Sequence, residues 1–366
     1  TGRGLEELLA SELRSLGIAV TAVERGGVRF SGGLETCYRA NLWLRTANRV
    51  LRPLAEFPCA TPQQLYDGVR MIEWHRFLTP DMTLAVDCNL RDSSLTHSGF
   101  VALKTKDAVV DQLRDRSGRR PNVDPRDPDL RVNVHLVKDR CTVSIDSSGA
   151  PLDRRGYRLA RTEAPLRENL AAALVLLSGW DGTTPFADPM CGSGTIAIEA
   201  ALIAGRRAPG LSRKFAFERW PEFDLSLWRR LVGEAQEAAL STLPVPVWGL
   251  DRDDTAVRSA RENSRRAGVS SIVTFAVGEL DSFAPPAQPG TIICNPPYGA
   301  RLEDIETLKP FYRRIGDVLK QRCAGYTAWL LVGDQDLAKE VGLKASRRIP
   351  LFNGPIECRL LKYELY

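Results

Sequence analysis

The chain has 366 residues, 43% of them hydrophobic, which is enough for two or three domains with substantial cores. No apolar run reaches the roughly 18 residues of a membrane span and no secretory signal is visible, so we expect neither a membrane protein nor a secreted one. The net charge of +5 is too small to identify a nucleic-acid-binding protein by itself, although most of the basic excess lies in residues 1–165.

The positions of the cysteines and histidines exclude further kinds of site. The eight cysteines are dispersed without a CxxC pair, which indicates reduced, mostly buried thiols in a cytoplasmic protein and argues against a zinc site or a disulfide framework. We therefore expect no metal ion. The three histidines, His75, His97 and His135, all lie in the first half of the chain, so we assign none of them as a catalytic base.

The first 150 residues predict two small α+β units. The elements expected in residues 1–50 are helices over 4–16 and 34–47 and a strand over 27–30. The elements expected in residues 51–150 are helices over 63–68 and 104–116 and strands over 83–88, 132–136 and 140–145. This second set suggests a helix-covered antiparallel sheet. Residues 121–129 contain three prolines and are expected to form a loop.

From residue 166 onward, strands and helices alternate in the βαβ manner, which predicts a parallel sheet with helices on both faces. Ligands of such sheets bind at the carboxyl ends of the strands. Four polar residues follow expected strands, and we expect them to converge at that edge although they are far apart in the sequence: Asp188, Asp251, Glu279 and Asn295.

The tetrapeptide Asn295, Pro296, Pro297 and Tyr298 follows the apolar run 291–294 and so lies where a buried strand ends. An asparagine held by two prolines can aim its side-chain oxygen, together with a backbone carbonyl, at the exocyclic amine of a flat base. Two acceptors that pull this amine toward tetrahedral geometry favour its attack on an electrophilic methyl group. Tyr298 can stack on the same base. We therefore expect these four residues to be catalytic.

A glycine-rich loop from Asp188 to Thr195 is the candidate site of the methyl donor. Gly192 and Gly194 allow a tight turn and a close approach to a ligand, and a buried helix is expected to begin at Thr195. The loop matches neither a P-loop nor a full GxGxxG pattern, so it is a weak signal alone.

Two acidic residues complete this candidate site. Asp251 ends the expected strand 245–250, where a carboxylate can accept both hydroxyls of a ribose. The alternative is that Asp251 caps the following helix. Gly278 and Glu279 follow the strand expected over 272–277, and the acidic side chain there can accept a hydrogen bond from an adenine amine or simply belong to the surface.

Together these motifs resemble the class I methyltransferases that use S-adenosylmethionine, and more closely the bacterial THUMP-domain RNA methyltransferases that form N2-methylguanosine. That group includes a ribosomal large-subunit type and relatives that modify transfer RNA. The resemblance covers essentially the whole chain and rests on further segments: residues 4–17, 97–99, 106–111, 120–121, 146–149, 155–158, 164–168 and 353–359.

The resemblance implies an α/β fold in three parts. It implies a ferredoxin-like α+β unit over 1–50, a THUMP RNA-binding domain over 51–155, and a Rossmann-like methyltransferase domain with a mostly parallel seven-stranded sheet over 156–366. The cofactor would be S-adenosylmethionine. The cofactor-binding residues that it implies are Pro165, Asp188, Met190, Cys191, Gly192, Gly194, Thr195, Asp251, Arg252, Gly278, Glu279 and Asn295.

Clustered basic residues are the candidate RNA contacts, because arginine suits bidentate phosphate contacts and stacking on exposed bases. Each cluster is equally well explained as solvated surface. The residues assigned to RNA are Lys106, Arg114, Arg116, Arg119, Arg120, Arg154, Arg155, Arg158 and Arg301.

Three departures from the family pattern bear on these expectations. The group usually has aspartate where Glu279 stands, and an aromatic residue would be expected where Met190 stands. The best-known bacterial relatives continue into a second methyltransferase domain, so we expect no second activity in this chain.

The sequence thus predicts an RNA (guanine-N2)-methyltransferase acting on a flipped-out guanosine, most favourably in 23S ribosomal RNA, in a cytoplasmic monomer or homodimer. Three alternatives stay open: a transfer RNA guanosine-N2 methyltransferase, a DNA adenine amino-methyltransferase and a non-catalytic RNA-binding assembly factor.

Overall fold

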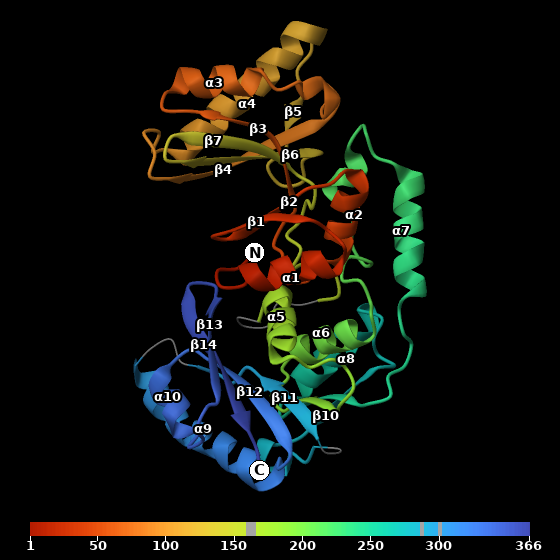
Figure 1. The fold of residues 1–366 in the computed structure, drawn as a ribbon, viewed down its shortest axis with the longest axis vertical. Helices are drawn as coiled ribbons and strands as arrows, with labels where there is room; N and C mark the ends of the chain where they lie inside the picture. The colour runs from red at the N-terminus through yellow and green to blue at the C-terminus, as the bar shows by residue number, and fades with distance from the viewer. Residues whose placement is uncertain (159–165, 286–288, 299–301) are drawn as a thin grey trace. The chain divides into compact units, whose positions relative to one another are not determined.

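The computed structural model describes the whole chain except residues 159–165, 286–288 and 299–301 (Figure 1). The chain forms two compact units. The first comprises Thr1–Asn48, Leu152–Arg213 and Leu231–Tyr366, and the second comprises Arg49–Pro151 and Lys214–Arg230.

A seven-stranded sheet forms the centre of the first unit. Its strands are β8 (Phe186–Asp188), β9 (Val247–Asp251), β10 (Val273–Val277), β11 (Gly290–Cys294), β12 (Tyr326–Val332), β13 (Arg347–Asn353) and β14 (Ile356–Glu364). They lie in the order β10-β9-β8-β11-β12-β14-β13. The first five are parallel, whereas β14 is antiparallel to both β12 and β13. The mostly parallel seven-stranded sheet and the closing hairpin are therefore confirmed.

Helices cover both faces of this sheet, as predicted (Figure 1). The helices after residue 166 are α5 (Glu168–Ser178), α6 (Thr195–Ala204), α7 (Leu225–Glu237), α8 (Asp254–Arg266), α9 (Leu302–Arg322) and α10 (Gln335–Glu340), with short 3-10 turns η2 (Ala216–Arg219) and η3 (Leu280–Ser282). One hydrophobic cluster joins α5, α6 and α8 to Ile293, and another joins α9 and α10 to Ile292. Successive residues of a strand point to opposite faces, so the two clusters are the two sides of the sheet.

The start of the chain also belongs to the first unit. Its elements are α1 (Glu6–Ser15), the antiparallel pair β1 (Val20–Glu24) and β2 (Gly27–Phe30), and α2 (Leu34–Trp43). The predicted helix over 4–16 and strand over 27–30 are confirmed, whereas β1 has no predicted counterpart. The helix predicted over 34–47 ends earlier because the Glu12 carboxylate accepts hydrogen bonds from the Arg45 and Thr46 amides, at 2.8 and 3.1 Å, where the chain has already left the helix.

The second unit contains a five-stranded mixed sheet. Its strands are β3 (Leu51–Pro58), β4 (Thr83–Arg91), β5 (Asn122–Val123), β6 (Leu130–Val137) and β7 (Arg140–Asp146), in the order β3-β7-β6-β4-β5, and its helices are α3 (Pro62–Arg70), η1 (Trp74–Arg76) and α4 (Ser98–Ser117). The expectation of an antiparallel sheet is wrong for β4, which pairs in parallel with both β5 and β6. The long α4 lies between β4 and β6 in the chain and provides the crossover that a parallel pair requires.

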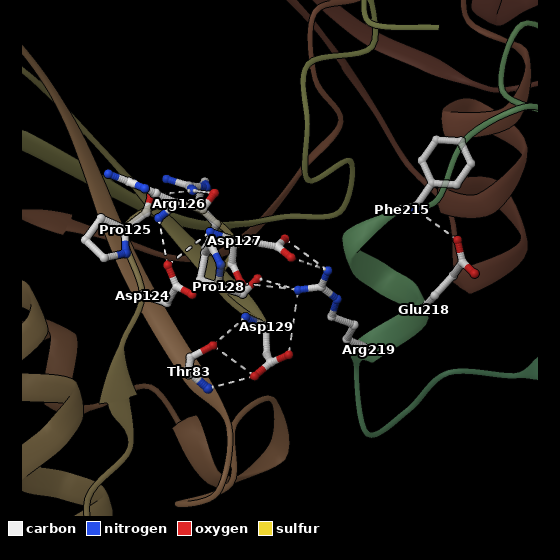
Figure 2. A network of polar contacts seen from close by, with 11 residues as sticks. Thr83, Asp124, Pro125, Arg126, Asp127, Pro128, Asp129, Phe215, Glu218 and Arg219 are labelled. Atoms are coloured by element: carbon white, nitrogen blue, oxygen red, sulfur yellow. Dashed lines mark hydrogen bonds and ion pairs between the residues drawn. The ribbon is translucent and has the colours of Figure 1, made fainter. Parts of the chain in front are cut away.

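The segment Lys214–Arg230 packs with the second unit, although it comes from the range predicted for the Rossmann-like domain. Figure 2 shows the Arg219 guanidinium directed at the Asp127 region, where its Nη2 lies 3.0 Å from both carboxylate oxygens of Asp127. Phe217 is fully buried, and its amide donates to the Ser147 carbonyl at 3.1 Å. An ion pair and a buried aromatic side chain thus anchor this insertion.

No helix in the described parts of the chain combines the length and the apolar character that crossing a bilayer requires.

Candidate functional site

The carboxyl ends of four neighbouring parallel strands bring the predicted site segments together. β10, β9, β8 and β11 are adjacent in the sheet and run in the same direction. Asp188 and Asp251 are the last residues of β8 and β9, and Asn295 directly follows β11. These three residues therefore lie at one edge of the sheet, as the alternating pattern predicted.

The Asp251 carboxylate holds the glycine loop. Its Oδ2 accepts a hydrogen bond from the Gly192 amide at 2.8 Å, and its Oδ1 accepts one from the Asp253 amide at 3.0 Å. The N-cap of α8 is Asp253, whose carboxylate accepts from the Thr255 amide at 2.8 Å, so the cap lies two residues beyond Asp251. A carboxylate offers about four acceptor positions, which leaves about two on Asp251 for further donors.

The glycine loop is packed tightly on one side. Gly192 and Gly194 have φ of +52° and +84°, a region that favours glycine. A Cβ on Gly194 would lie 2.8 Å from the Phe275 ring and 2.9 Å from the Ala260 Cβ, whereas a Cβ on Gly192 would meet no atom of the described residues within 4 Å. Asn263 completes the support, because its Nδ2 donates to the Ser193 carbonyl at 3.0 Å.

Asp188 lies beneath the loop. Its side chain is buried and accepts a hydrogen bond from the Met190 amide at 3.3 Å. Burial raises the pKa of Asp188 well above its ordinary value, and repulsion from Asp251 raises it further. Burial also raises the pKa of the Cys191 and Cys294 thiols, which favours their role as packing residues. All eight cysteines of the chain are free.

Asn295 carries an unsatisfied acceptor. Its Oδ1 is buried, and no described residue donates a hydrogen bond to it. A buried polar atom without a partner costs about 1–3 kcal/mol, so native proteins leave few of them. The two prolines that follow Asn295 are held by packing and by a hydrogen bond: Pro296 is buried, and the Pro297 carbonyl accepts from the Tyr312 hydroxyl at 3.2 Å. An amine placed at this atom would remove the penalty.

The Tyr298 ring is half-buried and packs against both hydrophobic clusters. Asn353 Nδ2 donates to its hydroxyl at 2.5 Å. Burial raises the pKa of Tyr298 to about 12, so the phenol stays protonated near neutral pH. Tyr298 is therefore a neutral aromatic surface at the carboxyl end of β11.

The other predicted cofactor residues surround this edge with less direct contacts. The Gly278 amide donates to the Asp251 carbonyl at 3.0 Å. Glu279 forms an ion pair with Arg314 at 3.3 Å, and Arg252 is exposed. Met190 and Cys191 belong to the loop already described. Pro165 lies outside the described residues.

The predicted RNA contacts of the second unit lie at the surface. Lys106 pairs with Asp107 at 2.7 Å and Arg114 pairs with Asp111 at 2.8 Å, while Arg119 pairs with Asp81. The side chains of Arg116 and Arg120 are exposed, and neither pairs with a described residue. Arg154, in the first unit, is exposed as well, and Arg301 lies outside the described residues.

The assignment of Arg155 to RNA is wrong for this structure. Arg155 is only 2% exposed; its Nη1 and Nη2 donate to the Leu152 and Arg45 carbonyls at 2.7 and 2.5 Å, and its Nε pairs with Glu199 at 3.4 Å. It is a structural residue. Exposed and buried residues alternate from Arg154 to Tyr157 in the structure, but the local sequence does not mark Arg155 as the buried arginine of the pair.

Arg158 is also largely buried, with 13% of its side chain exposed. Its Nη2 donates to the Leu166 carbonyl at 3.0 Å and to Thr195 Oγ1 at 2.9 Å, and its Nε pairs with Glu168 at 3.1 Å. These contacts hold the first residues of α5 and α6, so Arg158 supports the helix that follows the glycine loop.

Two residues of the site had no predicted role. They are Asn263, which holds the glycine loop, and Gly333, where an added Cβ would lie 2.6 Å from the Tyr298 ring. Asn353 was expected only as part of the closing hairpin. Nothing in the local sequence marks their contacts, because each partner lies tens of residues away.

Comparison with known proteins identifies the family. A family model described as the RMKL-like methyltransferase domain matches residues 155–362, more than half of the chain. The chain belongs to this methyltransferase family. The models of the THUMP domain and of the RlmL ferredoxin-like domain match residues 59–146 and 1–51. The expected ferredoxin-like, THUMP and Rossmann-like methyltransferase folds are confirmed.

Proteins with similar sequences are named as RNA methyltransferases. The chain is 43% identical over its whole length to a candidate RNA methyltransferase of Synechocystis, covering 95% of that protein. It is 44% identical to the ribosomal RNA large subunit methyltransferase K/L of Syntrophotalea carbinolica, covering 99% of this chain and 52% of that one. The chain spans about half the length of the curated K/L relatives that it matches.

Similar solved structures are methyltransferases as well. A candidate methyltransferase, SMU.472, complexed with SAH, is 35% identical with a TM-score of 0.91, covering 100% of this chain and 97% of that one. A candidate N6-adenine-specific DNA methylase of Listeria monocytogenes is 34% identical with a TM-score of 0.91, covering 100% and 95%. The expectation of an S-adenosylmethionine-dependent RNA methyltransferase is confirmed for the family.

The residues of this chain fit that cofactor. Among the described residues, nothing occupies the space where a Cβ on Gly192 would stand, and Asp251 keeps acceptor positions for two hydroxyls beside it.

Proposed function

We propose that this chain transfers a methyl group to the exocyclic amine of a guanosine in RNA, forming N2-methylguanosine, with 23S ribosomal RNA as its favoured substrate. The observation that carries this proposal is the buried, unpartnered Oδ1 of Asn295 at the end of β11. It is an acceptor that a base amine would satisfy. A ribosomal substrate also favours a cytoplasmic location.

The donor half of the proposed site consists of Gly192, Gly194 and Asp251. When bound, S-adenosylmethionine supplies an electrophilic methyl group on a sulfonium. Asp251 would accept hydrogen bonds from the ribose hydroxyls, and hydrogen bonds to a charged acceptor contribute about 1.5–3 kcal/mol. Gly192 would admit the ligand because it has no Cβ. Glu279 is the weaker candidate for the adenine contact, because Arg314 already pairs with it.

The acceptor half of the proposed site consists of Asn295, Pro296, Pro297 and Tyr298. Asn295 Oδ1 would accept an amine hydrogen and draw electron density onto the nitrogen. Tyr298 would stack on the flipped base, which contributes roughly 1–3 kcal/mol and offsets much of the cost of unstacking it. Alkylation makes the departing proton acidic, so no strong base is required. Tyr298 keeps its own proton, because its pKa is about 12.

The exposed arginines are the proposed RNA contacts outside the reacting base. Arg116 and Arg120 are the strongest members of this set, since no described carboxylate competes for them. Arg154 is a further member. Their guanidinium groups would contact phosphates and set the position of the RNA without reading its bases.

Three other functions remain as alternatives. Transfer RNA presents the same guanosine amine, so the acceptor half does not separate it from ribosomal RNA. Adenine in DNA also presents an exocyclic amine. A similar Listeria protein is named as a candidate DNA methylase, so DNA is included among the substrates to be tested. A non-catalytic assembly factor is the least favoured, because the glycine loop and the tetrapeptide are both intact.

Methyl incorporation from labelled S-adenosylmethionine into ribosomal RNA, transfer RNA and duplex DNA tests the proposal. We expect label in ribosomal RNA, recovered as N2-methylguanosine after digestion and mass analysis of the nucleosides. Label confined to transfer RNA would show that transfer RNA, and not ribosomal RNA, is the substrate. Label found only in DNA, as N6-methyladenine, would show that the chain is a DNA adenine methyltransferase. The assembly-factor alternative predicts no label and no heat of S-adenosylmethionine binding.

A further inference from the structure

The Tyr298 hydroxyl is fixed by a residue far along the chain. Asn353 Nδ2 donates to it at 2.5 Å, and Asn353 is the last residue of β13, opposite Ile356 in the closing hairpin. The hairpin is a firm support because β13 pairs with β14 along its whole length and β14 pairs with β12 of the central sheet. Tyr298 is therefore tied to the sheet by its hydroxyl as well as by its backbone.

The ring itself packs on Gly333, the residue directly after β12. A Cβ added to Gly333 would lie 2.6 Å from Tyr298 Cδ2, 3.0 Å from Cγ and 3.1 Å from Cε2. The first distance is shorter than real Cβ contacts, so any larger residue would displace the ring. Gly333 has no positive φ in the structure, so the absence of a side chain, rather than backbone conformation, is what the ring requires.

A third contact fixes the backbone beside the ring, where the Tyr312 hydroxyl donates to the Pro297 carbonyl at 3.2 Å. The ring orientation is therefore determined before any base arrives. Ordering a side chain in the free enzyme removes an entropy cost from binding, and stacking depends on the orientation of the ring plane.

We propose that Asn353 and Gly333 are positioning residues that hold Tyr298 as the stacking surface for the target base. The inference rests on the proposed function and extends its acceptor half to the hairpin β13–β14 and to the carboxyl end of β12. Neither residue touches the reacting atoms. Each acts through the Tyr298 ring, Asn353 by a hydrogen bond and Gly333 by leaving space.

The first test compares Asn353→Ala, Tyr298→Phe and the double variant in steady-state methylation of the RNA substrate. Each single change breaks the same hydrogen bond, so we expect KM for RNA to rise roughly three- to tenfold in both, with a smaller change in kcat. The double variant should be no worse than Tyr298→Phe alone, because nothing remains for Asn353 to hold. The dissociation constant of S-adenosylmethionine should stay within twofold of wild type in all three.

Ser346→Ala is the matched control, because it removes a hydrogen bond from Ser346 Oγ to the Lys362 carbonyl in the same hairpin without contacting Tyr298. We expect wild-type kinetics from it. The inference is overturned if Asn353→Ala leaves KM for RNA unchanged, if the effects of Asn353→Ala and Tyr298→Phe simply add, or if Ser346→Ala raises KM equally.

Gly333→Ala gives a second readout, because its methyl group displaces the ring directly. We expect kcat/KM for RNA to fall more than tenfold while S-adenosylmethionine affinity is kept. Wild-type kinetics in a folded Gly333→Ala protein would contradict the role of Gly333; if this variant does not fold, the Asn353 series decides. A wild-type chain that methylates no RNA would instead reject the proposed function, so the two failures are distinguishable.

Discussion

The donor and acceptor halves of the proposed site differ in how completely their polar groups are satisfied. In the donor half, both Asp251 oxygens accept backbone hydrogen bonds and Asn263 holds the loop from behind. In the acceptor half, Asn295 Oδ1 is buried and has no donor among the described residues. The donor half can hold its shape without a ligand, because its polar groups already bond to each other. The unpartnered acceptor in the other half indicates where a hydrogen-bond donor of the substrate would bind.

The framework behind the donor half should be the most sensitive to mutation. Arg155→Ala removes one partner of a buried ion pair and leaves Glu199, which is fully buried, without its charge partner. We expect a loss of about 3–5 kcal/mol in the free energy of unfolding, measured by denaturant titration. Arg154→Ala, at the exposed neighbouring position, should stay within about 0.5 kcal/mol of wild type. Equal stabilities of the two variants would contradict the structural role of Arg155.

Substitution of the two glycines of the loop should lower stability by different amounts. Gly194→Ala places a methyl group against Phe275 and Ala260 at positive φ, so we expect about 2–3 kcal/mol of destabilisation. Gly192→Ala should cost only about 1 kcal/mol of stability, because its Cβ meets no described atom within 4 Å.

For the affinity of S-adenosylmethionine we expect the reverse order, with the larger loss in Gly192→Ala. Gly192→Ala projects into the space assigned to the cofactor, and we expect S-adenosylmethionine to bind at least tenfold more weakly by calorimetry. A Gly192→Ala protein with wild-type affinity would show that the cofactor does not approach this residue.

Features of the fold and of the site could be predicted from the sequence where they depend on neighbouring residues, and could not where they depend on distant ones. The start of α6 at Thr195 and the polar residues at the strand ends were predictable, because glycine placement and apolar runs act over a few residues. The burial of Arg155 was not, because its carbonyl acceptor on Arg45 is 110 residues away. The parallel pairing of β4 and the packing of Lys214–Arg230 with the second unit depend on tertiary contacts in the same way.

The same distinction explains the acceptor half. The function of the tetrapeptide 295–298 could be predicted from its sequence, because few other kinds of site need an asparagine followed by two prolines and a tyrosine. The contacts that orient it come from Gly333 and Asn353, and a glycine and an asparagine beside strands carry no local signal of that role.

The smallest effects should come from the exposed arginines. Arg116→Ala and Arg120→Ala each remove one proposed phosphate contact, so RNA affinity should fall about two- to fivefold and the salt slope should decrease by roughly 0.7–0.9 per residue. S-adenosylmethionine affinity should not change. Filter binding over a salt series measures both quantities. An unchanged salt slope would remove these residues from the RNA surface.

The most direct test of the account is Asn295→Ala, followed by methyl transfer and by S-adenosylmethionine binding on the same protein. Loss of a preorganised acceptor for the reacting amine should lower kcat by about 100-fold or more. The dissociation constant of S-adenosylmethionine should stay within about twofold of wild type, because no hydrogen bond joins this side chain to the donor half in the part of the chain that the structure describes. Turnover within tenfold of wild type, with the cofactor still bound, would contradict the assignment of Asn295 as the acceptor of the base amine.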